Sequence, residues 1–437
     1  MDYRESLSYL EGLNVFGSKL GLSRIERLTE LLGHPERRYR TVHVTGTNGK
    51  GSVSAMTAAI LTKSGLKTGL YTSPHLTAYT ERFVIDGECA SEADFAAAVS
   101  AAAAAAQQML AEGLEQPTEF EVLTAAAFVY FAEKAVDYAV IEVGLGGLLD
   151  STNVIMPEVS VITNVALEHA DRCGGTLAGV ARHKAGIIKA GVPVVTAAAG
   201  MPLDVLQQKA EEEGADIFVL GEDFCVAPPK KADAGKGEIE FSSELLGIRA
   251  AHYALALGGA YQRKNAALAV MAANLLAAAH PSITQAAIAA ALQEVKWPGR
   301  FERFTLADTT VVVDGAHNPA GAAALRESLD ACFPDEARVF LLGILADKDC
   351  AAMLRTLLRA GDRVVITRPF SERAGDPEDL ARLAREITGE VEVVRAADEA
   401  LTRALAWATE ERILCAAGSL YLIGELRRSL LERGGFA

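Results

Sequence analysis

Short apolar runs alternate with longer segments of helical spacing along the first 295 residues. Apolar runs bounded by glycine or polar residues are typical of buried strands, whereas apolar positions three and four apart indicate helices. Strands are predicted at 40–46, 67–76, 137–144, 159–166 and 192–197. Helices are predicted at 3–34 (interrupted near Gly17 and Gly21), 52–65, 91–112, 121–134 and 176–190. This alternation favours a mostly parallel sheet with helices on both faces.

The pattern changes after residue 222. The segment 222–250 is polar and then alternates, which predicts a β-hairpin excursion, and helices follow at 259–279 and 284–293. Trp, Pro and Gly come together in KWPGRFER (296–303), as in an interdomain hinge. Five further strands are predicted at 309–316, 338–345, 363–369, 391–396 and 412–419. We therefore expect a first domain at 1–295, a hinge at 296–300, and a smaller Rossmann-like α/β domain at 301–437.

Composition narrows the class of protein. The chain has 437 residues and a formal net charge of −15, so no global positive field recruits a nucleic acid. Its six cysteines form no C-x-x-C pair, which favours free thiols in a reducing cytosol over disulfides or a zinc ribbon. The N-terminal segment lacks the apolar core of a signal peptide, and no apolar run approaches the roughly 20 residues that span a bilayer. We expect a cytoplasmic protein without membrane or nucleic-acid partners, and a monomer.

The stretch VTGTNGKGS (44–52) follows a predicted strand and opens a predicted helix. It departs from the common G-x-x-x-x-G-K-[ST] formula, because Val44 replaces the first glycine and Gly51 separates Lys50 from Ser52. Backbone N–H groups of a glycine-rich turn at a helix N-terminus can hold an anion. Lys50 could then contact outer phosphates, and Ser52 could bind Mg²⁺. The alternative, a glycine turn with a solvent-facing lysine, is disfavoured by the strand before and the helix after. The first domain is therefore predicted to resemble P-loop ATPases.

Three further side chains follow the predicted strands. Glu142 ends a buried run, where ligands of open α/β sheets collect, although a solvent-facing glutamate is the alternative. His169 also follows a strand, but a single histidine is more often structural. Lys184 lies in a predicted helix, where local sequence alone favours a solvated lysine. The adjacent GLGGLLD fails the dinucleotide fingerprint, because Leu149 occupies the third glycine position.

Twelve segments, in order along the chain, resemble folylpolyglutamate synthase, including the bifunctional dihydrofolate synthase form, a branch of the Mur-ligase-type ATP-dependent amide ligases. They are GSKLGLSRIERL (17–28), HVTGTNGKGSV (43–53), YTSPHL (71–76), YTERF (79–83), TEFEVLTAAAF (118–128), IEVGLGGLLDSTNVI (141–155), TNVALEHADRCG (163–174), HKAGIIKAGVPVV (183–195), YQRKNAALA (261–269), WPGRFE (297–302), DGAHNPAG (314–321) and AAGSLYLIGELR (416–427).

The resemblance implies transfer of the ATP γ-phosphoryl group to a folate carboxylate, followed by attack of the L-glutamate amine on the acyl phosphate. It implies nucleotide binding by Thr47, Asn48, Gly49, Lys50, Gly51, Ser52, Asn265, Arg300 and Asp314. Ser52, Glu142 and His169 match ligands of Mg²⁺. Lys184 matches a lysine that is carbamylated to support a second Mg²⁺, which requires a neutral amine and so a lowered pKa. Lys50, His169, Lys184 and Arg300 are the predicted catalytic set.

The same resemblance places Ser73, His75, Thr118, Phe120 and Asp150 on the pterin side, and His317 on the glutamate side. For Phe120, the alternative is an ordinary core aromatic. The chain departs from the common family pattern at Leu148, Glu168 and His183. Dihydropteroate is therefore a second candidate acceptor, behind reduced folate.

Two other functions are alternatives to a folate ligase. A Mur ligase acting on a UDP-muramoyl substrate generally carries a UDP-binding domain before the phosphate loop, and only 45 residues precede Gly46 here. A nucleotide-binding protein without catalysis would not need the predicted hinge and second domain.

Overall fold

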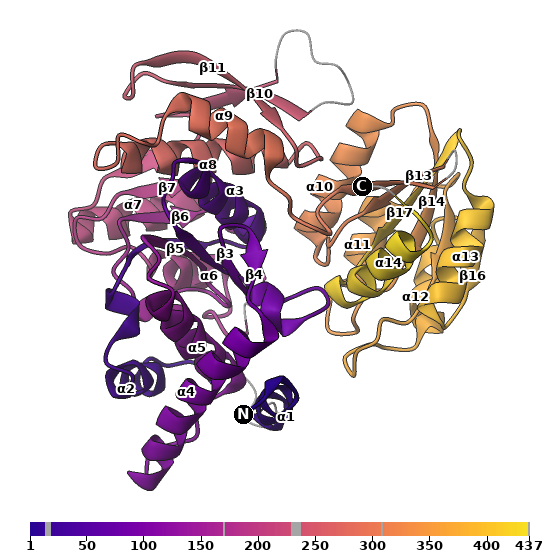
Figure 1. Cartoon of the computed structure of the whole chain (residues 1–437). Helices are drawn as coiled ribbons and strands as arrows, with labels where there is room; N and C mark the ends of the chain where they lie inside the picture. The colour runs from indigo at the N-terminus through magenta and orange to yellow at the C-terminus, as the bar shows by residue number, and fades with distance from the viewer. Residues whose placement is uncertain (14–18, 169–170, 229–236, 307–308, 436–437) are drawn as a thin grey trace. The chain divides into compact units, whose positions relative to one another are not determined.

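The computed structural model describes residues 1–435 except 14–18, 169–170, 229–236 and 307–308 (Figure 1). Its contacts divide the chain into two compact units. The first comprises Met1–Ala227, Glu240–Tyr253 and Lys264–Val295, and the second comprises Pro228–Ile239, Ala254–Arg263 and Lys296–Ala437. The hinge at 296–300 and the functional division between two domains stay predictions. No helix in the described part of the chain combines the length and apolarity that crossing a membrane requires.

An eight-stranded sheet, in the order β4-β3-β2-β5-β1-β6-β7-β8, forms the centre of the first unit. β2, β5, β1, β6, β7 and β8 run parallel, and β3 and β4 form an antiparallel edge. The strands are β1 (Arg40–Thr45), β2 (Thr68–Tyr71), β3 (Phe83–Ile85), β4 (Glu88–Cys89), β5 (Tyr138–Glu142), β6 (Val159–Ile162), β7 (Val194–Thr196) and β8 (Ile217–Val219). The parallel strands bring their carboxyl ends to one edge, so the segments after β1, β2, β5 and β6 meet there.

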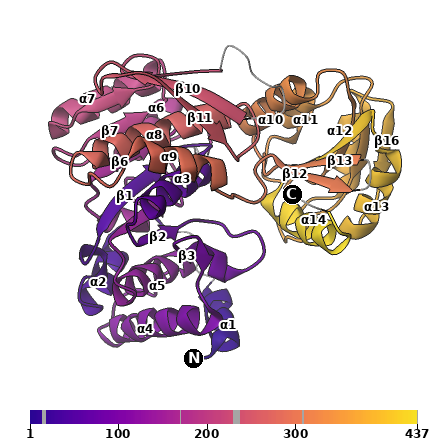
Figure 2. The same cartoon turned by 45° about the horizontal axis from the view of Figure 1, so that its top comes forward.

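Helices cover both faces of this sheet, as predicted. They are α1 (Tyr3–Leu13), α2 (Ser23–Leu31), α3 (Lys50–Lys63), α4 (Glu92–Ala111), α5 (Glu119–Glu133), α6 (Leu177–Ala185), α7 (Met201–Glu213), α8 (Gln262–Ala277) and α9 (Gln285–Glu294). Figures 1 and 2 show α3, α8 and α9 on one side of the sheet and α4 and α5 on the other. The α4/α5 side encloses an apolar core in which Phe83, Phe95 and Phe128 are fully buried.

Some predicted helix boundaries are confirmed and others are wrong. α4 begins where predicted, because Ser91 accepts a hydrogen bond from the backbone N–H of Asp94. α6 ends at Ala185, five residues before the predicted end, because the chain turns at Gly186. The predicted excursion is confirmed as a three-stranded sheet of β9 (Cys225–Ala227), β10 (Gly237–Ser243) and β11 (Ile248–Leu255).

The second unit is a six-stranded sheet in the order β12-β13-β17-β14-β15-β16. Its strands are β12 (Glu302–Leu306), β13 (Thr309–Val313), β14 (Ala337–Leu342), β15 (Arg363–Ile366), β16 (Glu390–Val393) and β17 (Arg412–Ala417), and its helices are α10 (Pro319–Cys332), α11 (Cys350–Leu357), α12 (Pro377–Arg385), α13 (Ala397–Trp407) and α14 (Leu420–Glu432). The five predicted strands are confirmed. β12 was not predicted, because it is an antiparallel edge strand directly after the Pro-Gly turn.

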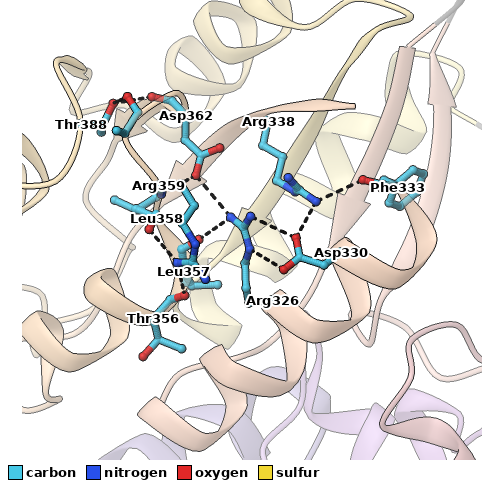
Figure 3. Close-up of polar contacts among 11 residues, drawn as sticks. Arg326, Asp330, Phe333, Arg338, Thr356, Leu357, Leu358, Arg359, Asp362 and Thr388 are labelled. Carbon is cyan, nitrogen blue, oxygen red and sulfur yellow. Dashed lines mark hydrogen bonds and ion pairs between the residues drawn. The ribbon is translucent and has the colours of Figure 1, made fainter. Parts of the chain in front are cut away.

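A polar network around two buried arginines joins α10, β14 and the start of β15 in this unit (Figure 3). Arg326 donates to Asp330 at 3.0 Å and to the Leu357 carbonyl at 2.9 Å, and forms an ion pair with Asp362. Arg338 donates to Asp330 at 2.7 Å. Both arginines are about nine-tenths buried, and their contacts with Asp330 and Asp362 offset much of the cost of burying their charges, although Arg338 Nε has no partner among the described residues.

Candidate functional site

The loop between β1 and α3 requires glycine at two positions. Gly46 has φ +150°, and a Cβ there would lie 1.8 Å from Thr163 Oγ1. Gly49 has φ +89°, and a Cβ there would lie 2.5 Å from Asn265 Oδ1. The close approach places Asn265, predicted to be on the nucleotide side, directly beside the loop.

The segment after β6 forms hydrogen bonds with the loop between β1 and α3. Asn164 accepts from the Thr47 N–H through its carbonyl and from the Asn48 N–H through Oδ1, each at 3.0 Å. The Thr163 hydroxyl and the Asn164 amide both donate to the Asn48 carbonyl, at 2.6 and 3.0 Å. The N–H groups of the first turn of α3, from Lys50 onward, lack intrahelical acceptors and are the groups that can receive an anion.

Lys50 folds over this loop. Its Nζ donates to the carbonyls of Gly46 at 3.1 Å and Thr47 at 3.3 Å, and the side chain is half-buried. The alternative of a lysine projecting into solvent is therefore wrong. An ammonium group held on loop carbonyls is close to where a phosphate bound at the first turn of α3 would need a counter-charge.

Ser52 and Glu142 supply oxygen donors at the same sheet edge. Glu142 ends β5, pairs alongside Val44 of β1, and is buried, so the solvent-facing alternative is wrong. Its Oε2 accepts from the Ser73 N–H at 3.3 Å. Ser52 is buried in the first turn of α3. One hydroxyl and one carboxylate suit Mg²⁺, which takes few protein ligands and completes its shell with phosphate and water.

His169, the third predicted metal ligand, lies outside the described residues. Among the residues that the structure describes, no group of three or more His, Cys, Asp and Glu side chains is arranged to hold a metal.

Lys184 is buried in α6, with 5% of its surface exposed, so the solvated-lysine interpretation is wrong. Burial, and to a smaller extent the positive charge of Lys50, lowers its pKa to about 7. The structure therefore provides the lowered pKa that carbamylation requires.

Ser73 and His75 follow β2 at the same edge. The His75 Nδ1 accepts from Arg82 Nε at 2.9 Å, and its ring lies 4.4 Å, centroid to centroid, from Tyr79. Burial and the Arg82 charge lower the pKa of His75 to about 4, so its imidazole is neutral at pH 7. A neutral ring bonded to Arg82 can present its Nε2–H as a donor.

Phe120 packs against Gly144, in the segment that follows β5. Its ring stacks on Tyr71 with centroids 6.2 Å apart, and a Cβ at Gly144 would lie 2.5 Å from Phe120 Cζ. Phe120 packs against the α4/α5 core and is partly buried. One face is thus a core contact, and stacking on a heterocycle stays a prediction.

Thr118 caps α5. Its Oγ1 accepts from the Glu121 N–H at 3.3 Å, and the Glu121 carboxylate accepts from the Thr118 N–H at 2.8 Å. Arg24 Nε donates to the same carboxylate at 3.0 Å. Glu121 and Arg24 were missed from sequence, although the T-x-x-E spacing of 118–121 is a capping-box signal. A substrate role for Thr118 stays a prediction.

Asp150 is buried and accepts from its own chain: the Leu145 N–H at 2.8 Å, the Thr152 N–H at 3.0 Å and the Thr152 hydroxyl at 2.6 Å. Burial raises its pKa despite these bonds. Asp150 thus fixes the loop between Glu142 and the 3-10 turn Ser151–Val154.

The second unit brings Arg300, Asp314 and His317 together at the end of β13. Asp314 Oδ2 accepts from Tyr261 Oη at 2.6 Å and from the Phe301 N–H at 2.8 Å. Burial raises the pKa of Asp314. A Cβ at Gly315 would lie 3.0 Å from Arg300 Nη1, and His317 Nδ1 lies 2.8 Å from the Gly315 carbonyl. Asp314 therefore shapes the turn that carries Arg300, and its contact with nucleotide stays a prediction.

Two family models match the chain. Residues 44–273 match the model of the Mur ligase middle domain, and residues 299–420 match the Mur ligase glutamate ligase domain. The chain is 38% identical to the folylpolyglutamate synthase of Lacticaseibacillus casei over 440 residues, which covers 99% of both chains. It is 33% identical to the dihydrofolate synthase/folylpolyglutamate synthase of Bacillus subtilis over 434 residues, covering 98% of this chain and 99% of that one.

Solved structures agree. The folylpolyglutamate synthase of Mycobacterium tuberculosis, in crystals complexed with ADP and AMPPCP, superposes with a TM-score of 0.87 at 34% identity. The superposition covers 98% of this chain and 99% of that chain.

Proposed function

The chain belongs to the folylpolyglutamate synthase and dihydrofolate synthase family of Mur-type ligases, and from this membership we propose the assignments that follow. It is an ATP-dependent ligase that joins L-glutamate to the carboxylate of a reduced folate. Its partners are small molecules, ATP, reduced folate and L-glutamate, and it works in the cytoplasm as a monomer without nucleic acid.

The first-unit residues prepare the phosphoryl group for transfer to the folate carboxylate. The loop amides of 49–52 hold the nucleotide phosphates, and Lys50 exchanges its loop carbonyls for an outer phosphate oxygen. Ser52 and Glu142, with His169, would hold Mg²⁺, which neutralises phosphate charge when bound. The setting of Glu142 supports this role, because its carboxylate is buried at the carboxyl end of β5, the edge of the sheet at which the loop 44–52 also lies.

Lys184 is assigned the carbamylated role. A lysine with a pKa of about 7 is half neutral at pH 7, and the neutral amine adds to CO₂ to give a carbamate and a proton. The product is an anion in place of a cation beside Lys50, which supports a second Mg²⁺ at this edge.

Acceptor and glutamate recognition are assigned to two groups of residues. Ser73, His75, Thr118, Phe120 and Asp150 serve the folate side. Arg300 steadies the transferring phosphate, Asp314 and Asn265 serve the nucleotide, and His317 serves the glutamate. The acyl phosphate reacts with water, so these side chains must also exclude water from the site.

The observation that carries the proposal is the match along nearly the whole length of both chains to folylpolyglutamate synthases, with the loop 44–52 in its predicted setting. The test measures ADP release from ATP with tetrahydrofolate and L-glutamate, with single omissions of each as controls. Turnover that requires all three supports the proposal. Turnover with UDP-muramoyl substrates and none with folate would overturn it.

Dihydropteroate is a second candidate acceptor, favoured by the similarity to the Bacillus subtilis dihydrofolate synthase/folylpolyglutamate synthase. The same assay with dihydropteroate in place of tetrahydrofolate decides whether one chain accepts both.

A further inference from the structure

A fully buried histidine lies beneath the proposed folate side. His43 is in β1, paired alongside Ile141 of β5 and Ser160 of β6, and none of its surface is exposed. Its Nε2 lies 2.8 Å from Thr152 Oγ1, while its Nδ1 has no hydrogen-bond partner among the described residues. Burial, together with the charge of Lys189, lowers its pKa to about 3, so the ring is neutral.

The neighbouring bonds decide which nitrogen carries the proton. The Thr152 hydroxyl lies 2.6 Å from Asp150 Oδ1, and a carboxylate is the stronger acceptor, so the hydroxyl hydrogen points to Asp150. The Thr152 oxygen then accepts from His43, which must carry its proton on Nε2. This tautomer leaves a bare lone pair, rather than an N–H group, at the unpartnered Nδ1. An orphaned buried N–H is the rarer of the two in native proteins.

Asp150 connects Thr152 to the loop after β5 through hydrogen bonds of its carboxylate. Its Oδ2 accepts from the Leu145 N–H at 2.8 Å, and the next residue, Gly146, accepts from the Thr45 hydroxyl at 2.7 Å. Gly144, on the other side of Leu145, lies directly under the Phe120 ring. The loop therefore has little freedom to move without displacing Phe120.

We propose that His43 is a positioning residue for the folate side: through Thr152 it orients Asp150, and through Asp150 it sets the loop Gly144–Gly147 beneath Phe120. This inference rests on the proposed function, because the folate side is assigned there. The phosphate loop shares one hydrogen bond with this segment, from Thr45 to Gly146, but its Thr47 and Asn48 are held by Thr163 and Asn164, so we expect the relay to act on the acceptor more than on ATP.

The test compares two substitutions at Thr152. Thr152→Val keeps the volume and removes the hydroxyl, which separates His43 from Asp150, whereas Thr152→Ser keeps the hydroxyl. Thr41→Val is the matched control, because Thr41 is a buried threonine in β1, the strand of His43, and its hydroxyl donates to the Met156 carbonyl rather than to the relay. KM for tetrahydrofolate, KM for ATP and thermal unfolding are measured for each variant.

Thr152→Val is expected to raise KM for tetrahydrofolate about tenfold, with KM for ATP changed by less than about twofold. Thr152→Ser should restore the wild-type value, and Thr41→Val should leave both constants near wild type. Equal constants for Thr152→Val and Thr41→Val would overturn the relay. Absence of any folate-dependent turnover in the wild type would instead overturn the proposed function.

A second measurement needs no substitution. Ring ¹⁵N chemical shifts of histidine-labelled protein, with His43→Gln to assign the signal, report the tautomer of His43. A neutral ring protonated on Nε2 across pH 5–8 is expected. A ring protonated on Nδ1, or a charged ring at pH 5, would contradict the hydrogen-bond order from His43 to Asp150.

Discussion

Asn265 Oδ1 occupies the space where a side chain on Gly49 would begin, 2.5 Å from the position of its Cβ. Gly49 also has φ +89°, a conformation that costs an L-residue about 1–2 kcal/mol. Gly49→Ala should therefore combine backbone strain with displacement of Asn265. We expect the variant to fold and to bind ATP at least tenfold more weakly, as measured by calorimetric titration.

Gly65→Ala is the matched control for this prediction. Gly65 follows the other end of α3 with φ +81°, but nothing lies within 4 Å of its Cβ position. Its substitution should lower the free energy of unfolding by about 1–2 kcal/mol and leave ATP affinity unchanged. Equal ATP affinity for Gly49→Ala and the wild type would show that the loop does not hold the nucleotide.

Lys50→Ala removes the ammonium group that lies over the loop carbonyls of Gly46 and Thr47. The fold should persist, since these two bonds join residues of one loop, whereas ATP turnover should fall by about two orders of magnitude or more. Lys63→Ala, which removes an exposed lysine at the far end of the same helix, is the control. ADP release and thermal unfolding are measured together. Near-normal turnover by Lys50→Ala would remove this lysine from the mechanism.

The strand, glycine turn and helix around 44–52 could be predicted from sequence because their determinants are local. The strand, the glycines and the helix start within one short segment, and their chemistry follows from backbone geometry. The helix caps at Ser91 and Thr118 are also local, because each side chain bonds the backbone N–H three residues later. For Thr118, however, the family resemblance pointed to a substrate role instead.

Other features depend on segments that are distant in sequence. Lys184 has a lowered pKa because α6 packs it out of water, and a lone lysine in a helical pattern does not indicate that burial. Arg24 meets Glu121 across 97 residues, and Tyr261 meets Asp314 across 53. Such pairings are set by the tertiary fold, so hydrophobic periodicity cannot indicate them.

The lowered pKa of His75 predicts a loss of stability in acid. In the folded chain the ring titrates at about 4, but in the unfolded chain it titrates near 6.5. Between these values the unfolded state binds the extra proton, so the free energy of unfolding falls with decreasing pH, by up to about 1.4 kcal/mol per unit from this group. Urea unfolding of the wild type and His75→Gln at pH 7.5, 6 and 5 measures this effect.

The His75→Gln variant should show a shallower dependence on pH than the wild type. His252→Gln, which changes an exposed histidine, controls for the loss of one imidazole. If the His75→Gln and wild-type curves are parallel between pH 6 and pH 5, His75 does not titrate as its burial and the Arg82 charge imply.

The network in Figure 3 gives a prediction that concerns stability alone. Arg326→Met leaves Asp362 buried without its cationic partner and removes a donor to the Leu357 carbonyl. Breaking a buried pair from one side costs about 3–5 kcal/mol, so the midpoint of urea unfolding should fall clearly. Arg382→Met breaks the Arg382–Asp379 pair, whose side chains are both more than 70% exposed, and should cost no more than about 1 kcal/mol. Equal midpoints for the two variants would mean that burial does not make the Arg326 network stabilising. A large loss in Arg326→Met alone would show that these charges hold α10 against β14 and β15.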